Sequence, residues 1–380
     1  MKIEQSRFMP STGWETEKLG ELGSAAKLVL AFGSPQLIED AQRLSEIEHA
    51  YSNAVIVGCS TAGEITDVEV TDDSLTVTAV APGDTRIRGA TLPLGGAGGS
   101  HDAGVELARQ LSGAELRHVL VLSEGLHVNG SELARGLNEA LPAGTTVSGG
   151  LAGDGERFGR TLILAEGTAA PDRVTAVGLY GEKLRTSCGS LGGWDPFGPE
   201  RLVTRAEGNI LYELDGRSAL AIYRKYLGPY EKDLPASALL FPLALRRRGD
   251  DPAVVRTILA IDDDAGTMTF AGDMPEGSYA RFMKANFDRL VDGATRAAKD
   301  SFEAMDSATP ELALLISCVG RKMVLKQRIE EEVEGVRRIF GPGPVLTGFY
   351  SYGEMSPFTP HSDCRLHNQT MTITAFREVQ

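Results

Sequence analysis

Short apolar runs recur along the chain, and each is bounded by glycine, proline or polar residues. Runs of this length that are apolar at nearly every position are typical of strands covered on both faces. The runs span residues 27–32, 54–57, 75–80, 118–122, 161–165 and 312–316. Apolar side chains spaced three and four positions apart predict amphipathic helices at residues 36–50, 131–141 and 328–340. Strands that alternate with helices predict an α/β fold.

The order strand, helix, strand occurs three times, over residues 28–65, 119–155 and 312–355. Each copy ends in a glycine followed at once by an acid: Gly63-Glu64, Gly153-Asp154 and Gly353-Glu354. A single ending of this kind is explained by an ordinary strand-end turn. Three endings predict a shared architecture, although they do not by themselves predict a shared ligand.

Composition narrows the class of protein. A length of 380 residues is enough for two or three domains of about 150 residues each. The chain carries 38 Lys and Arg against 52 Asp and Glu, and this net charge of −14 repels polyanions. We therefore expect neither nucleic acid nor a membrane surface as a partner.

Cysteine content and the N-terminus bear on location. The chain has 4 cysteines without a C-x-x-C pair, too few for a disulfide scaffold, which indicates a reducing compartment. Glu4 interrupts the apolar stretch that a signal peptide needs, and no later run approaches the ~18 apolar residues of a membrane span. We expect a soluble, cytoplasmic protein.

Residues 58–63, GCSTAG, raise the question of nucleophilic catalysis. In a nucleophile elbow, Ser60 would attack with His367 as its base, but Ala62 stands where the motif needs a second glycine. Cys59 is the better candidate, since backbone N–H groups at a strand end lower the pKa of a thiol. The alternative is that Cys59 is an unreactive residue that fills a tight turn.

A second group of candidates suits a small charged ligand. Arg321 directly follows an apolar strand and offers a bidentate fork for a carboxylate or phosphate. Glu64, Asp154 and Glu354 end the repeated units, where an acid would hold an ammonium group. The alternative is that Arg321 pairs with one of these acids and holds the repeats together.

The spacing His361-x-x-Cys364-x-x-His367 resembles a metal site. Prolines precede the segment and an alternating run follows it, so an extended conformation is expected, in which residues three apart point to opposite sides. Two histidines alone do not complete a tetrahedral zinc shell, so we do not expect zinc.

Several segments in the right order resemble FIST-domain proteins, named from F-box and intracellular signal transduction. The segments similar to the FIST N-terminal domain are 28–32 (LVLAF), 58–65 (GCSTAGEI), 149–154 (GGLAGD) and 194–216. Those similar to the FIST C-terminal domain are 219–228 (ALAIYRKYLG), 255–258, 318–321 (CVGR), 348–354 (GFYSYGE) and 366–370 (LHNQT). The resemblance implies an α/β, two-domain FIST-type fold of repeated strand–helix–strand units with mixed sheets, divided into residues 25–216 and 217–370.

The resemblance also implies a sensory ligand-binding protein of signal transduction that is not an enzyme. Too few residues flank the matched segments for an output domain, so we expect the signal to reach a histidine kinase or another output protein. A homodimer is left open. The residues expected to bind a small-molecule ligand are Cys59, Ser60, Glu64, Asp154, Arg321, Tyr352, Glu354 and Asn368.

Some stand-alone members of the family look like haem-binding nitric-oxide sensors. Haem would be non-covalent here, because the chain lacks a C-x-x-C-H attachment. His127 and His367 are the expected axial ligands: His127 follows a predicted strand, where open sheets place ligands, and His367 lies in LHNQT. The alternatives are a sensor of an amino-acid-like or anionic ligand, a Cys59-dependent enzyme and a protein-binding scaffold.

Overall fold

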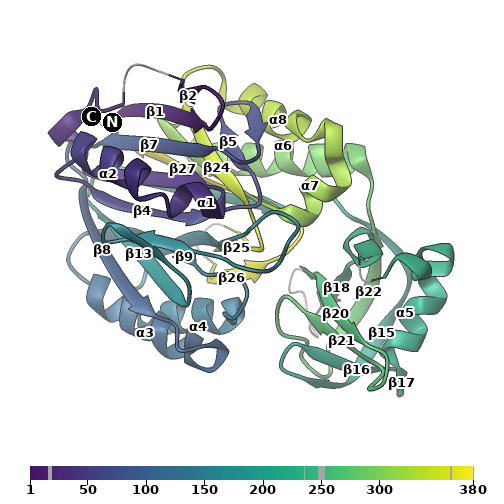
Figure 1. The fold of residues 1–380 in the computed structure, drawn as a ribbon. Helices are drawn as coiled ribbons and strands as arrows, with labels where there is room; N and C mark the ends of the chain where they lie inside the picture. Colours follow the sequence, from purple (N-terminus) through teal and green to yellow (C-terminus); the bar gives the residue numbers. More distant parts are fainter. Residues whose placement is uncertain (16–18, 235, 247–252, 360–361, 380) are drawn as a thin grey trace.

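The computed structural model describes residues 1–15, 19–234, 236–246, 253–359 and 362–379. Figure 1 shows two bodies joined by two connectors. We call residues 1–191 and 287–379 the main body, and residues 195–284, which are inserted between them, the small domain. The fold is mixed α/β, as predicted, with mixed sheets.

Three strand–helix–strand units form the frame of the main body. The two strands of each unit pair in parallel, which confirms the predicted repeat. The pairs are β3 (Leu28–Gly33) with β4 (Val55–Ser60), β9 (Leu116–Ser123) with β10 (Thr146–Leu151), and β23 (Leu312–Cys318) with β24 (Val345–Ser351). Leu30, Leu120 and Leu314, one from the first strand of each unit, are buried in one shared core.

The helices largely follow the predicted periodicity, with one break. The predicted helix over 36–50 is two helices, α1 (Pro35–Ile38) and α2 (Ala41–Ala50). The helix is interrupted at Asp40, which is the N-cap of α2. Its carboxylate accepts hydrogen bonds from the Gln42 and Arg43 backbone N–H groups. The other main-body helices are α3 (Ser100–Leu111), α4 (Gly130–Ala140), α6 (Phe287–Ala304), α7 (Val319–Leu325) and α8 (Glu330–Phe340).

Three sheets of the main body are built from these units, listed here in spatial order. The first is β12 (Thr168–Ala170), β11 (Ile163–Ala165), β4, β3, β7 (Leu75–Ala81), β1 (Lys2–Met9) and β2 (Gly13–Trp14). The second is β26 (Cys364–His367), β25 (Gly353–Pro357), β10, β9, β13 (Arg173–Tyr180) and β8 (Arg86–Pro93). The third is β14 (Leu184–Leu191), β27 (Met371–Glu378), β23, β24, β5 (Glu64–Thr66) and β6 (Glu69–Thr71).

Strands from distant parts of the chain share these sheets. The early strand β5 pairs with the late strand β24, and the late strand β25 pairs with β10. Segments from both predicted ranges, 25–216 and 217–370, therefore lie in common sheets of the main body. Helices α3 and α4 pack closely on each other because Gly136 has no side chain at their contact. A Cβ on Gly136 would lie only 2.1 Å from the His101 carbonyl oxygen.

The small domain has its own sheet and its own core. Its elements are β15 (Asp195–Glu207), β16 (Ile210–Leu214), β17 (Arg217–Ser218), α5 (Ala219–Leu227), β18 (Leu243–Arg246), β19 (Val254–Arg256), β20 (Ile258–Asp262), β21 (Thr267–Phe270) and β22 (Tyr279–Lys284). Tyr223, Phe270 and Phe282 are fully buried in that core. Among the described residues of both bodies, no helix is long and apolar enough to span a bilayer.

Candidate functional site

Two of the predicted acids are bonded within the protein. Glu64 accepts hydrogen bonds from the backbone and hydroxyl of Ser74, and Glu354 accepts the same two bonds from Thr370. A hydroxyl three residues earlier adds a further bond to each acid, from Thr61 and Ser351. Burial raises the pKa of Glu64 to about 7 and that of Glu354 to about 8, even though these hydrogen bonds lower it. Both carboxyls are buried and hold strand ends in place.

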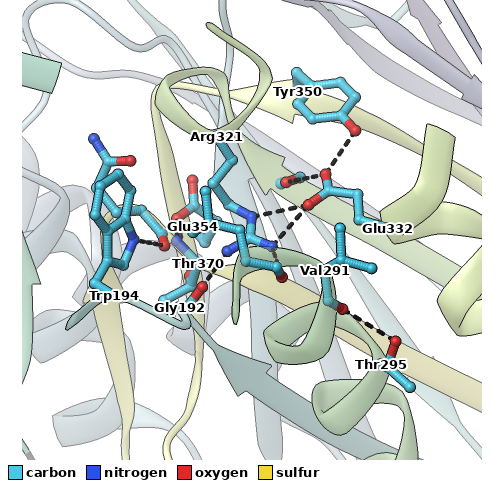
Figure 2. Close-up of polar contacts among 12 residues, drawn as sticks. Gly192, Trp194, Val291, Thr295, Arg321, Glu332, Tyr350, Glu354 and Thr370 are labelled. Atoms are coloured by element: carbon cyan, nitrogen blue, oxygen red, sulfur yellow. Dashed lines mark hydrogen bonds and ion pairs between the residues drawn. The ribbon is translucent and has the colours of Figure 1, made fainter. Parts of the chain in front are cut away.

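Arg321 forms a buried ion pair with Glu332, and the predicted acid Glu354 lies nearby (Figure 2). Its Nη2 and Nε lie 2.7 and 3.1 Å from Oε2 of Glu332 in α8, and both side chains are fully buried. Nη2 also donates to the Leu290 carbonyl, 2.7 Å away, and Nη1 to the Gly192 carbonyl. Arg321 therefore pairs with an acid, as the structural alternative held, but the acid is Glu332 rather than Glu64, Asp154 or Glu354. The guanidinium already joins α7 to α8, to α6 and to the connector at Gly192, so it is not available to a ligand carboxylate.

The nucleophile elbow is also contradicted by the geometry. The Ser60 hydroxyl accepts a hydrogen bond from the Leu162 backbone N–H at 2.8 Å, and His367 Nε2 is bonded to the Ser356 carbonyl at 3.0 Å. Both side chains are buried and they do not form a nucleophile–base pair. Burial, together with nearby Glu64, raises the pKa of the Cys59 thiol, which is the opposite of the expected lowering.

The two histidines expected to bind haem do not fit that group. His127 lines a pocket of about 190 Å³, which is below the roughly 300–1,000 Å³ of cavities that enclose drug-sized ligands. His367 is 2% exposed, and its Nε2 is already hydrogen-bonded to the Ser356 carbonyl at 3.0 Å. His361 lies outside the described residues, and within them no cluster of three His, Cys, Asp or Glu side chains is arranged to hold a metal ion.

Asp154 and Tyr352 meet at the carboxyl ends of the parallel strands. The Tyr352 hydroxyl donates to the Asp154 carboxylate, whose other oxygen accepts the backbone N–H groups of Gly159 and Arg160 at 2.9 and 2.8 Å. Burial opposes ionisation of Asp154, but these hydrogen bonds outweigh it and lower its pKa. This pair fixes the loop after β10. Asn368 is separate and fully buried, and neither amide atom has a hydrogen-bond partner among the described residues.

A polar cleft of about 460 Å³ separates the main body from the small domain. Asp363 and Arg365 line it from the main body, on either side of Cys364 at the start of β26. Arg256 and Asp273 line it from the small domain. We call this hollow the junction cleft. It brings together charges of both signs from two bodies.

Asp363 and Arg365 were not among the residues predicted from the sequence. Both side chains are exposed, and neither forms a hydrogen bond or ion pair with any residue in the described part of the chain. Asp363 directly precedes β26 and Arg365 is its second residue, and the charge pattern Asp-x-Arg was a local signal for this pair. The cleft itself depends on how the small domain meets the main body, which local patterns do not reveal.

Comparison with family models decides the relationship. Residues 27–217 match the FIST N domain, and residues 219–357 match the FIST C domain. The chain belongs to the FIST family. FIST domains are associated with sensing in signal transduction.

Several curated relatives of this FIST protein are similar over part of their length. An uncharacterized protein of Mycobacterium tuberculosis is 27% identical over 253 residues, covering 63% of each chain. An uncharacterized protein of Methanocaldococcus jannaschii is 27% identical over 208 residues, covering 51% of this chain and 39% of its own. The match thus spans less than two-thirds of these relatives. A PurLQS structure from Thermotoga maritima aligns with a TM-score of 0.18 and 11% identity over 95% of this chain and 68% of its own, too low to support any argument.

Proposed function

We propose that this FIST protein is a non-enzymatic cytoplasmic sensor that binds a small zwitterionic, amino-acid-like ligand in the junction cleft. The observation that carries the proposal is the pair Asp363 and Arg365, two exposed charges of opposite sign with no side-chain partner in the described structure. An amino acid offers the complementary carboxylate and ammonium groups. Arg recognises a carboxylate through a bidentate fork, and Asp accepts hydrogen bonds from an ammonium group.

The size and position of the cleft support a sensory role. Its volume of about 460 Å³ lies within the roughly 300–1,000 Å³ usual for small-molecule sites. The main body and the small domain both line it, so a ligand that contacts both favours one relative arrangement of the two. Arg256 already links the bodies, since its Nη1 donates to the Leu366 carbonyl at 3.1 Å. A partner histidine kinase or another output protein would read this arrangement.

A thermal-shift screen with each standard L-amino acid tests the proposal. At least one amino acid should raise the melting temperature of the wild-type protein, because a ligand that binds the folded state stabilises it. Arg365→Gln and Asp363→Asn should lose the shift. Arg296→Gln, an arginine on α6 with 72% side-chain exposure, should keep it as the matched control. The proposal fails if no amino acid stabilises the wild type, or if the shift survives in both cleft variants.

A further inference from the structure

A second hollow, which we call the apolar pocket, lies at the carboxyl ends of β9 and β10 and has a volume of about 190 Å³. The main body contributes Phe158, Tyr352 and residues 125–129, and the small domain contributes Asn209, Leu259 and residues 270–272. A hydrogen bond of 3.1 Å joins Asn129, which lines the apolar pocket, to Asp273, which lines the junction cleft. The two hollows are neighbours with different linings.

Phe158 is held at this pocket in a backbone conformation that L residues rarely adopt. Its φ is 50°, in the left-handed region, where a bulky side chain is an outlier. Its backbone N–H donates to the Tyr352 hydroxyl at 3.2 Å, and its ring stacks on the Tyr352 ring with centroids 4.5 Å apart and planes at 16°. Strained residues of this kind persist where the surroundings hold them, and they gather at ligand sites. The Asp154 carboxylate fixes Tyr352 in turn, so the aromatic platform is formed in advance.

Two large apolar side chains are exposed at the pocket, one from each body. Phe158 is 38% exposed and Leu259 is 46% exposed, although apolar side chains of this size gain free energy when they are covered. Leu126, Val128 and Phe270 extend the same apolar lining. A flat apolar ligand would cover surface from both bodies at once.

The polar groups of the lining carry hydrogen-bonding capacity but little charge. The described lining contains no Lys, Arg, Asp or Glu. His127 has 74% side-chain exposure, with Nδ1 3.5 Å from the buried Glu124 carboxylate, and Asn209 donates to the Phe270 carbonyl at 2.8 Å. These groups suit a ligand with one N–H or O–H group rather than a charged ligand.

We propose that the apolar pocket binds a neutral, planar aromatic ring bearing an N–H or O–H group, of the size of indole or phenol. The ring lies against Phe158 and Tyr352, and its polar group pairs with His127 or Asn209. The volume of about 190 Å³ admits a single or fused ring and excludes a macrocycle. This site is distinct from the junction cleft and does not depend on the sensor function proposed above.

Calorimetric titration of the full chain with indole tests this site. The wild type should bind one indole, and Phe158→Ala should weaken binding by about tenfold or more through loss of ring stacking. Phe158→Gly provides a second variant that relieves the positive φ, so it keeps the fold and should weaken binding equally. Phe287→Ala, at a phenylalanine that is 48% exposed and starts α6, should leave binding unchanged.

Cyclohexanol, which has the hydroxyl but no aromatic ring, should bind more weakly than phenol by a similar factor. The proposal is overturned if the wild type binds neither indole nor phenol, if both Phe158 variants bind indole as the wild type does, or if cyclohexanol matches phenol. The polar-cleft variant Arg365→Gln should bind indole normally, which separates failure of this site from failure of the amino-acid site.

Discussion

Glu64 and Glu354 occupy equivalent places in two of the repeats, and both are buried with hydroxyl and backbone donors around them. The sequence placed both acids at the ends of the repeated units and suggested that they bind a ligand. It did not show their structural role, because half of their hydrogen-bond partners lie elsewhere in the chain. Ser74 and Thr370 are ten and sixteen residues away, respectively. The hydroxyl three residues before each acid was the local sign of a structural role. The role of each acid thus depends on hydrogen-bond partners that only the three-dimensional fold brings next to it.

Glu354→Gln should change how stability depends on pH. The folded-state pKa of Glu354 is about 8, above its ordinary value of 4.5, because burial disfavours the charge. The native state therefore binds a proton that the unfolded state has lost, and wild-type stability falls as pH rises from 4.5 to about 8. Glutamine does not ionise. The free energy of unfolding of the variant should therefore rise relative to that of the wild type by roughly 1.4 kcal/mol per pH unit across that window.

Unfolding in guanidinium chloride at about pH 5.5, 7 and 8.5 measures how the free energy of unfolding of each protein depends on pH. Glu378→Gln is the control. Burial raises the pKa of Glu378, but hydrogen bonds from Thr85 and the Gly83 backbone outweigh it and lower the pKa below 4.5. Its stabilisation is lost only as pH falls below that value, so its difference from wild type should stay constant across the window. A constant difference for Glu354→Gln as well would show that Glu354 ionises normally in the folded protein.

The strand–helix–strand units were predictable because their periodicity is local, and all three appear as parallel pairs. Contacts between helices and strands were harder to predict from the sequence. Arg321 was placed correctly after a strand, but its partner Glu332 belongs to the next helix, α8, and their contact depends on how α7 and α8 fold back on each other. The same pair reaches Gly192 and Leu290, which flank the small domain. Element packing thus decided the role that the sequence left open for Arg321, and it supplied a partner, Glu332, that the sequence did not name.

Arg321→Met should lower the free energy of unfolding by about 3–5 kcal/mol, because it leaves the buried Glu332 carboxylate without its cation. Adding Glu332→Gln removes that charge and keeps an oxygen for the Tyr350 hydroxyl, so the double variant should recover most of the loss. Guanidinium unfolding of both variants measures the effect. Arg328→Met, in an exposed ion pair with Glu331, should cost less than about 1 kcal/mol. Equal losses in the single and double variants would contradict this account of the buried pair.

The arrangement of the whole molecule was the least predictable level. Residues 195–284 leave the main body as an inserted small domain with a sheet of its own, and none of the predicted strands or helices lay within them (Figure 1). Strands such as β5 and β25 cross to sheets built from distant segments, and pairing of this kind has no local signature. The junction cleft and the apolar pocket both arise where the two bodies meet. Candidate ligand sites are consequently a property of the assembled molecule rather than of any one motif.

The distance between the two bodies tests most directly whether this protein senses a ligand by moving them. Spin labels at Arg109→Cys on α3 and Lys225→Cys on α5 report it through dipolar electron resonance, and both positions are exposed and outside the cleft. A millimolar mixture of the standard L-amino acids should shift the distance distribution to a shorter, narrower one, because a ligand that contacts both bodies holds them together in one relative arrangement. The shift should be absent when Arg365→Gln is added. A distribution that is unchanged by the amino acids, or that shifts equally in the Arg365→Gln protein, would contradict the account.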